Sequence, residues 1–347
     1  MTVRAAVIGL GDISALHLDA IAGLADAELV AVCDIDAERA QTAAARLGVA
    51  AFTDHRSLLA AAKPDVVHIC TPHSEHAVAV VDALDAGVDV IVEKPVARDP
   101  QQAAAVEDAA ARSSAKIAVC FQNRYNTPVR AAKEMLDSGE LGAITGAAGT
   151  VIWHRTPEYY QASPWRGTWA GGGGGLLMNQ AIHTLDLLRW LVGPVTAVAG
   201  TASTRALPIA VEDTAELTLT HENGAHSVFY ATLAHAANEP ITVDIVTEKA
   251  RLSLRGDLTV TYADGRVETV AEERLATGER SYWGVSHERL ITDFYLRRDD
   301  AEPFWITPGD GARLVDIIHE VYRGSYPEQS SQLTENPAPT ENGVVIA

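Results

Sequence analysis

The stretch VRAAVIGLGDISALHLDAI (residues 3–21) joins a short apolar run to a segment with helical periodicity. Gly9 at the junction allows a tight strand-to-helix reversal, and Gly11 lets the backbone approach a pyrophosphate held by the free N–H groups of the helix. Ser14 replaces the third glycine of the G-x-G-x-x-G pattern, so this motif alone is a weak signal. The predicted dinucleotide turn comprises Gly9, Gly11, Asp12 and Ile13.

Short apolar runs alternate with amphipathic segments through residue 121. This order predicts a doubly wound parallel sheet with helices on both faces, an α/β domain over residues 1–121. Ligands of such sheets bind beyond the carboxyl ends of the strands. The predicted strands are VRAAVIG, ELVAVCD, AAFTD, DVVHIC, VDVIVE and KIAVCF, and the predicted helices are Ser14–Leu24, Asp36–Leu47, Ser57–Ala62, Glu75–Ala86 and Pro100–Ser113.

Asp34 ends the second predicted strand. Its spacing in sequence from the glycine turn is about that expected for an acid that binds the ribose hydroxyls. Its carboxylate would repel a 2′-phosphate, so we expect NAD as the preferred cofactor, with NADP retained as the second option. The alternative is that Asp34 caps the next helix, a role that suits Asp36 better. Further cofactor contacts are predicted at the ends of later strands, at Thr71, Pro72, His76, Glu93, Lys94, Gln122 and Asn123. For His76 the alternative is a place in the first turn of its helix.

Lys94 stands at the carboxyl end of a buried apolar strand, where no solvent-facing periodicity explains a lysine. Pro95 restricts the outgoing backbone and favours an extended conformation at Lys94. An ammonium held there can stabilise alkoxide character on a substrate oxygen as hydride leaves the carbon. The alternative is a salt bridge to Glu93 or another nearby acid.

The pattern changes after residue 121 and predicts an α+β domain over residues 122–324, built on an antiparallel sheet. The remaining residues, 325–347, are rich in Pro, Ser, Thr and Glu and are predicted to be a poorly ordered tail. Strands are expected near 195–203, 211–220, 224–233, 240–247, 251–255, 258–262 and 266–270, and helices at Pro128–Ser138 and near 284–298 and 308–323.

Five glycines, residues 171–175, precede a helix whose polar stripe points to chemistry. The glycines permit close approach to a ligand or another chain segment, or alternatively form a flexible linker. At 100° per residue one face of the helix is apolar and the other carries Asn179, His183, Asp186 and Trp190. That stripe is either a solvated surface or a site, and the histidine and tryptophan favour a site.

Composition limits the classes of partner and compartment. The formal charge is −19, from 46 acidic and 27 basic residues, without a basic cluster, so we expect no nucleic-acid or anionic-membrane partner. The chain shows neither a leader sequence nor an apolar run of bilayer length. The three cysteines lack C-x-x-C spacing, which predicts buried free thiols, no zinc or other metal site, and a cytoplasmic protein.

Several motifs together resemble the Gfo/Idh/MocA oxidoreductases, from Val3 to about Arg323. The motifs are VIGLG, VCDID, TPHSEH, EKP, FQNRYN, SPWRGTW and GGLLMNQAIHTLDLLRWLVG. The resemblance implies a Rossmann domain and a C-terminal domain with a large, mostly antiparallel open sheet that forms the interface of a homodimer or homotetramer. It also implies NAD(P)-dependent hydride transfer at a secondary hydroxyl of a sugar or a cyclitol such as inositol.

The resemblance also implies roles for individual residues. It assigns substrate binding and proton handling to Lys94 and acid/base catalysis to His183. Asn179 departs from the Asp of many relatives, and its amide can orient a hydroxyl but cannot accept a proton. Trp165 and Arg166 match a segment that approaches the nicotinamide or the substrate.

The predicted mechanism has His183 remove the hydroxyl proton while Lys94 stabilises the developing charge, with Asp186 orienting the imidazole. Three other functions stay open: an NADPH-dependent reductase of ketosugars, a glycosidase that uses bound NAD, and a non-catalytic regulator that senses a dinucleotide. An aromatic-rich stretch suits stacking against a sugar ring, or alternatively serves packing, and comprises Trp153, His154, Tyr159, Tyr160, Trp165 and Trp169.

Overall fold

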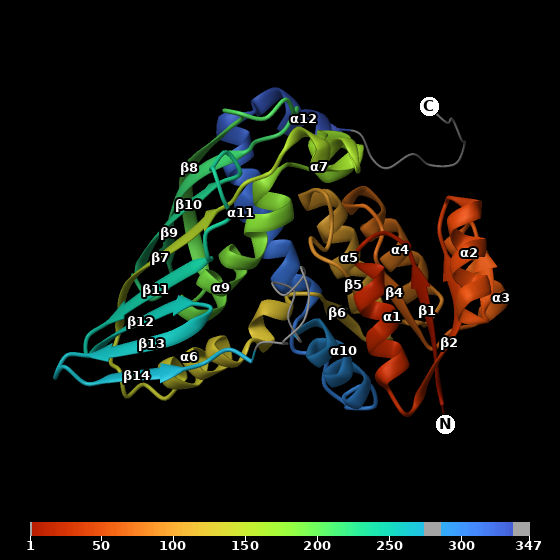
Figure 1. The fold of residues 1–347 in the computed structure, drawn as a ribbon, viewed down its shortest axis with the longest axis horizontal. Helices are drawn as coiled ribbons and strands as arrows, with labels where there is room; N and C mark the ends of the chain where they lie inside the picture. Colours follow the sequence, from red (N-terminus) through yellow and green to blue (C-terminus); the bar gives the residue numbers. More distant parts are fainter. Residues whose placement is uncertain (1, 274–285, 336–347) are drawn as a thin grey trace.

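The computed structural model describes residues 2–273 and 286–335 (Figure 1). Its first sheet has six parallel strands in the order β3-β2-β1-β4-β5-β6. This order confirms the predicted doubly wound fold, because the strand order reverses beside β1. The strands are β1 Val3–Ile8, β2 Ala27–Cys33, β3 Ala50–Phe52, β4 Val66–Ile69, β5 Asp89–Val92 and β6 Ile117–Val119, and the helices are α1 Ser14–Gly23, α2 Ala37–Leu47, α3 His55–Ala62, α4 His73–Asp85 and α5 Pro100–Arg112.

Aspartates begin several of these helices. Asp36 caps α2 by accepting the N–H groups of Glu38 and Arg39, and Asp54 and Asp99 cap α3 and α5 in the same way. A side-chain cap of this kind stabilises a helix by about 1 kcal/mol. The helix α1 differs, because Ile13 at its N-cap position makes no side-chain capping bond. The N–H groups of Ser14 and Leu16 donate to the Gly11 and Ile13 carbonyls, so a ligand at this end would be bound by the other N–H groups of the turn.

The second sheet has eight strands in the order β14-β13-β12-β11-β7-β10-β9-β8. Only the pair β10 and β7 is parallel among these strands, so the sheet is mostly antiparallel, as expected. The strands are β7 Ile144–Ile152, β8 Val195–Ser203, β9 Thr214–His221, β10 His226–Thr232, β11 Thr242–Thr247, β12 Ala250–Arg255, β13 Asp257–Tyr262 and β14 Val267–Val270.

Helices cover one face of this sheet, between the sheet and the Rossmann domain (Figure 1). They are α6 Thr127–Asp137, α9 Ile182–Val192 and α11 Pro308–Ser325. The short elements η1 Gln122–Tyr125, α7 Pro157–Gln161, η2 Pro164–Gly167, α8 Trp169–Gly172 and the π-helical turn η3 Leu177–Ala181 lie between the longer ones in sequence. On the strands of the sheet, Val228, Tyr230 and Val246 are exposed apolar residues.

The helix α10 (Ser286–Leu296) packs against α1 of the first domain, although it was predicted as part of the second domain. The Tyr295 hydroxyl lies 3.0 Å from His68 Nε2, and Arg298 Nε donates to Asp89 over 2.6 Å. The first domain is thus completed by a segment distant in sequence.

The prediction of a poorly ordered tail from residue 325 is wrong for its first part. Residues Pro327–Glu335 form the helix α12. Apolar anchors hold it, because the Tyr326 ring lies 5.0 Å from that of Trp169 and Leu333 is 6% exposed. Residues 336–347 of the predicted tail lie outside the described residues.

Cys33, Cys70 and Cys120 are buried free thiols, as predicted. Burial raises the pKa of all three, so they are protonated and unreactive. Within the described ranges, no helix is both long and apolar enough to cross a bilayer.

Candidate active site

The turn after β1 has the geometry that its glycines predict. Gly9 has φ +90°, and a Cβ atom there would lie 2.6 Å from the carbonyl carbon of Cys70. No atom lies within 4 Å of a Cβ at Gly11, so that side of the turn is open. Ser14 donates to the Gly11 carbonyl over 2.7 Å and is itself buried. An open turn leading to an uncapped helix N-terminus fits a pyrophosphate.

Asp34 accepts hydrogen bonds on both carboxylate oxygens. The N–H of Leu10 donates to Oδ2 over 2.8 Å and the N–H of Asp36 to Oδ1 over 2.9 Å. Arg39 Nη1 lies 3.1 and 3.2 Å from the two oxygens. Because Asp36 is the helix cap, the capping alternative for Asp34 is excluded. Arg39, whose side chain is 52% exposed, covers the carboxylate that was predicted to bind ribose.

The loop after β4 brings the predicted residues Thr71 and Pro72 beside the glycine turn. His76 is buried beneath them, with Nε2 lying 2.8 Å from the Thr71 oxygen and Nδ1 lying 2.6 Å from the Pro95 oxygen. It therefore joins the loop after β4 to the loop after β5. This geometry supports the alternative placement of His76, within its helix.

Lys94 follows β5, and the Lys94–Pro95 peptide bond is cis. Its Nζ donates to the main-chain oxygen of Asn179 over 2.5 Å. The predicted alternative, a salt bridge to Glu93, is not formed, because His17 and His287 occupy the Glu93 carboxylate at 3.1 and 3.0 Å. Loss of surrounding water lowers the pKa of Lys94 to about 8. Glu93, predicted to bind the cofactor, is buried between two histidines instead.

His183 lies in the first turn of α9, directly after the π-helical turn that contains Asn179. Burial, followed by the positive charge of Lys94, lowers the pKa of His183 well below its usual value. The imidazole is therefore neutral and competent to accept a proton near pH 7. The Asn179 amide Nδ2 lies 3.4 Å from the Tyr159 hydroxyl, while its main-chain oxygen accepts from Lys94. π-Helical turns occur frequently at functional sites.

The prediction that Asp186 orients His183 is wrong. The Asp186 carboxylate accepts two hydrogen bonds from Arg124, at 2.8 and 2.5 Å, and both side chains are 1% exposed. The Arg124 guanidinium also lies 5.4 Å from the centre of the Trp190 ring. The polar stripe on α9 is thus divided between the site at His183 and a buried ion pair at Asp186. It is not a solvated surface.

The glycine-rich segment packs against other parts of this chain, as one of its predicted alternatives required. A Cβ at Gly173 would clash with Arg98, one at Gly174 with Tyr322, and one at Gly175 with Glu212. Gly173 and Gly174 also have positive φ angles of 71° and 152°. The flexible-linker alternative is excluded, because these contacts fix the segment on three sides.

Arg166 connects the second domain to the dinucleotide turn. Its guanidinium lies 3.7 Å from the Asp12 carboxylate and 4.7 Å from the centre of the Tyr159 ring. Trp165 packs edge to face on His73 at 4.7 Å between ring centres. Tyr160 and Trp169 instead pack in the interior, with Trp169 5.0 Å from the Tyr322 ring. Two of the six residues of the aromatic stretch, Tyr160 and Trp169, therefore serve packing.

Buried polar atoms test whether these residues fit a cofactor and substrate. Thr71 Oγ1, Gln122 Oε1 and His183 Nδ1 are buried and have no hydrogen-bond partner among the described residues. Such atoms are costly unless a ligand or water satisfies them. All three are predicted site residues near the carboxyl edge of the parallel sheet, so the arrangement fits a bound dinucleotide. Asn123 follows Gln122 in the short helix η1 and is partly buried.

Three histidines at this edge were not among the residues predicted from the sequence. His73 Nδ1 lies 2.9 Å from the Gly172 oxygen and ties α4 to the glycine-rich segment. His17 and His287 enclose Glu93 from helices α1 and α10. The dense histidines of TPHSEH and of the first helix were a usable signal for His73 and His17. Nothing local marks His287, because its position depends on α10 packing onto the first domain.

Two family models match adjoining parts of the chain. Residues 3–121 match the model described as oxidoreductase family, NAD-binding Rossmann fold, and residues 129–253 match the GFO/IDH/MocA C-terminal domain. The chain belongs to the GFO/IDH/MocA oxidoreductase family. The geometry of the turn, the lysine and the histidine is therefore that of a member of an NAD-binding oxidoreductase family.

Individual relatives of this family include a D-apiose dehydrogenase from Paraburkholderia graminis, 33% identical over 226 residues, which are 65% of this chain and 59% of that protein. The WlbA dehydrogenase from Bordetella pertussis, solved with NADH and UDP-GlcNAcA, is 29% identical with a TM-score of 0.81, covering 94% of this chain and 97% of that one. A levoglucosan dehydrogenase solved with NADH is 26% identical with a TM-score of 0.84, covering 94% and 98%. The chain spans 54% to 59% of the length of four of these curated relatives, less than two thirds of each.

Proposed function

We propose that this chain oxidises a secondary hydroxyl of a sugar or cyclitol with NAD as hydride acceptor. The observation that carries the proposal is the meeting of Lys94, from the end of β5, with the segment of Asn179 and His183 in the second domain. An ammonium and a neutral imidazole in one site suit removal of a hydroxyl proton, because one stabilises the oxyanion while the other accepts the proton.

The cofactor site comprises the backbone from Gly9 to Ile13, Asp34, and the unpartnered polar groups of Thr71 and Gln122. Bound NAD would supply the hydride acceptor. Asp34 supports NAD over NADP, because a carboxylate accepts ribose hydroxyls and repels a phosphate. Arg39 must move aside for ribose to reach Asp34, and its exposure allows this.

In the proposed reaction His183 accepts the hydroxyl proton and Lys94 stabilises the negative charge on the substrate oxygen. The low pKa of His183 keeps it neutral, and the Lys94 pKa of about 8 keeps most of its ammonium charged at pH 7. The Asn179 amide and the Tyr159 hydroxyl are suited to orient further hydroxyls of the substrate. The sugar or polyol specificity, including inositol, is supported by the relatives named dehydrogenases of D-apiose and levoglucosan.

We also propose a homodimer or homotetramer that uses the open face of the eight-stranded sheet. Its support is the apolar exposure of that sheet, where Val228 is 56% and Val246 44% exposed. The three free thiols support a reducing compartment, the cytoplasm. Light scattering of the full chain, with Val228→Asp as the disrupting variant, tests the assembly.

A substrate panel tests the activity. Inositols, aldoses and anhydrosugars are incubated with the full chain and NAD, and NADH formation is followed by absorbance. We expect turnover with at least one polyol and higher kcat/KM with NAD than with NADP. Preference for NADPH with ketosugars would favour the reductase, tightly copurifying NAD without net turnover would favour the glycosidase, and dinucleotide binding without any hydride transfer would favour the regulator.

A further inference from the structure

Glu212 is a fully buried acid that takes no direct part in the proposed proton transfer. It lies two residues before β9 and is 0% exposed. Among the described residues, its carboxylate bonds to a tyrosine hydroxyl and to backbone N–H groups, and not to a cation. Burial of a carboxylate without a cation costs several kcal/mol, so the hydrogen bonds of Glu212 must offset that cost.

Three donors converge on the two carboxylate oxygens of Glu212. Oε2 accepts the N–H of Gly175 over 2.8 Å. Oε1 accepts the N–H of Leu177 over 2.8 Å and the hydroxyl of Tyr322 over 2.6 Å. The main-chain oxygen of Glu212 also accepts the N–H of Leu176, over 3.1 Å. Glu212 therefore binds three successive backbone N–H groups at the end of the glycine-rich segment.

This segment leads directly into the π-helical turn η3, which holds Lys94. The N–H of Asn179 donates to the Gly175 oxygen over 3.0 Å, and the Asn179 oxygen accepts from Lys94 Nζ over 2.5 Å. The line of hydrogen bonds from Glu212 to Lys94 is therefore unbroken, through the peptide groups of Gly175 and Asn179. His183 follows the same turn, at the start of α9.

Close packing leaves the glycine-rich segment little freedom to shift. A Cβ at Gly175 would overlap the main-chain oxygen of Glu212, and one at Gly174 would overlap the hydroxyl of Tyr322, which is 0% exposed. The segment is thus enclosed between the backbone of Glu212 and the ring of Tyr322. If the bonds to Glu212 are lost, the strain passes to the turn that follows.

Glu212 acts on Lys94 through this backbone and not through its charge. The charged groups that act on Lys94 are Glu93 and Arg166, while loss of surrounding water is the main cause that lowers its pKa to about 8. Displacement of the turn would admit water to the ammonium. The pKa of Lys94 would then rise toward its usual value.

We propose that Glu212 is a positioning residue for the oxidation, because it fixes the π-helical turn whose Asn179 oxygen holds the Lys94 ammonium at the substrate oxygen. The inference rests on the proposed function, in which Lys94 stabilises the negative charge on that oxygen. Such stabilisation depends on where the ammonium nitrogen lies. A displacement of about 1 Å at a reacting group costs about a hundredfold in rate.

Glu212→Gln is the variant that tests this role. The amide has the size of the carboxylate, but its NH2 group cannot accept, so one of the two N–H groups of the segment loses its acceptor. Burial raises the pKa of Glu212 to about 7, so kinetics are compared above pH 7, where the wild-type side chain is mostly ionised. We expect kcat with NAD and the best polyol to fall by about tenfold or more. The Kd for NADH should stay within about threefold of wild type, because the dinucleotide turn lies in the other domain.

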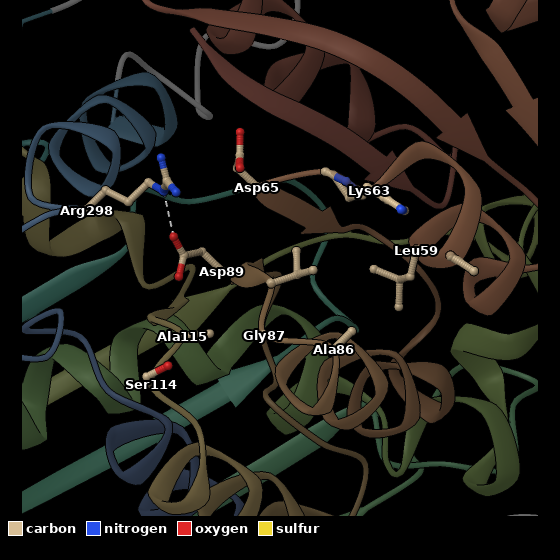
Figure 2. A pocket seen from close by; sticks show the side chains of 12 residues that line it. Leu59, Lys63, Asp65, Ala86, Gly87, Asp89, Ser114, Ala115 and Arg298 are labelled. Carbon is tan, nitrogen blue, oxygen red and sulfur yellow. Dashed lines mark hydrogen bonds and ion pairs between the residues drawn. The ribbon is translucent and has the colours of Figure 1, made fainter. Parts of the chain in front are cut away.

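Two matched variants separate position from stability. Tyr322→Phe removes one donor to the same carboxylate and leaves both N–H bonds in place. Asp89→Asn alters a carboxylate that likewise accepts a backbone N–H, from Lys116 over 2.8 Å, and a side chain, Arg298 Nε over 2.6 Å. Asp89 borders a cavity at the amino end of β5, the end opposite Lys94 (Figure 2). We expect both variants to be less stable to urea and to keep kcat within about threefold of wild type.

A second measurement follows Lys94 itself and needs no turnover. The rate at which acetic anhydride acetylates Lys94 is measured by mass spectrometry across a range of pH, because only the neutral amine reacts. We expect a midpoint near pH 8 in wild type, Tyr322→Phe and Asp89→Asn. In Glu212→Gln the midpoint should lie at higher pH, since water reaches the displaced ammonium.

The outcomes distinguish the two proposals. Wild type without hydride transfer from any polyol overturns the proposed function, and the acetylation midpoints still decide whether Glu212 positions Lys94. A wild-type kcat or an unchanged midpoint in folded Glu212→Gln overturns the positioning role. An equal fall of kcat in Glu212→Gln and Tyr322→Phe also overturns it, in favour of a loss of stability.

Glu212→Asp replaces Glu212→Gln if the glutamine variant does not fold. It keeps the charge but is one methylene shorter, so it cannot hold both N–H groups from the same backbone position. We expect the same fall of kcat and the same rise of the acetylation midpoint, and wild-type values of either would overturn the positioning role.

Discussion

The ammonium nitrogen of Lys94 lies 2.5 Å from the main-chain oxygen of Asn179, 85 residues later in the chain. This bond joins the loop after β5 of the Rossmann domain to the π-helical turn before His183. Because the acceptor is a backbone atom, the side chain at residue 179 can vary without loss of the link. An asparagine at residue 179, where the resemblance implies an aspartate in many relatives, is therefore compatible with this position of the lysine.

The ionisation of Lys94 should set the upper limb of the pH profile. Its pKa is lowered to about 8, from about 10.4 in a free chain, so its charge is present below pH 8 and lost above it. We expect kcat/KM for oxidation to fall as the pH rises through about 8. Lys94→Arg should remove this falling limb, since guanidinium stays charged. A limb that rises through pH 8 in wild type would instead make Lys94 the base.

The pair Asp34 and Arg39 should determine cofactor choice. Asp34→Ser removes the ribose acceptor and frees Arg39 for a 2′-phosphate, so we expect the preference for NAD over NADP in kcat/KM to fall by about tenfold to a hundredfold. Asp36→Ser is the matched control, because serine retains the helix cap while the same charge is removed. An equal change in both variants would assign the effect to general electrostatics.

Gly175 should be indispensable for folding stability. A Cβ there would clash with the Glu212 carbonyl, and Glu212 already accepts the Gly175 N–H over 2.8 Å. We expect Gly175→Ala to lower the free energy of unfolding by about 2 kcal/mol or more, by overpacking. Gly23→Ala, with no atom within 4 Å of its added Cβ, should be neutral or stabilising by up to about 1 kcal/mol. Urea titrations of both variants provide the comparison, and equal midpoints would refute the packing argument.

Asp186 should support the fold and have no part in proton transfer. Asp186→Asn removes the main partner of the buried Arg124 charge and leaves only Asp310 at 3.5 Å, which should cost up to about 3–5 kcal/mol of unfolding free energy. Asp137→Asn removes the exposed pair with Lys133 and should cost less than about 1 kcal/mol. Protonation of His183 should lower kcat/KM at acid pH, and this acid limb of the pH profile should lie at the same pH in folded Asp186→Asn as in wild type. A shift of the acid limb in that variant would support Asp186 as an orienting partner of His183.

The order of strands and helices in the first domain could be predicted, because its apolar runs and turn glycines are local signals. Lys94 could also be found, since no solvent-facing periodicity explains a lysine after a buried strand, although a salt bridge to a nearby acid stayed open as the alternative. The side chains that these residues contact could not be predicted. Helical phase placed His183 and Asp186 on one face, but it carries no information on Arg124, which is 62 residues away in the chain and takes the carboxylate.

The tail illustrates the same limit. Its composition favours disorder, and the helix α12 forms because Tyr326 and Leu333 find apolar surface on distant elements. The hydrogen bond between Tyr295 and His68 likewise depends on α10 lying against α1 and β4. Spacing within the sequence reports none of these contacts.

The role of His183 as the base of the oxidation is tested with His183→Ala, by measuring turnover of the best polyol and NADH affinity on the same preparation. We expect kcat to fall by about a hundredfold or more, the contribution of an acid–base group, while the Kd for NADH stays within about threefold of wild type. Turnover that persists in His183→Ala, or joint loss of turnover and NADH binding, would contradict the assignment of His183 as the base.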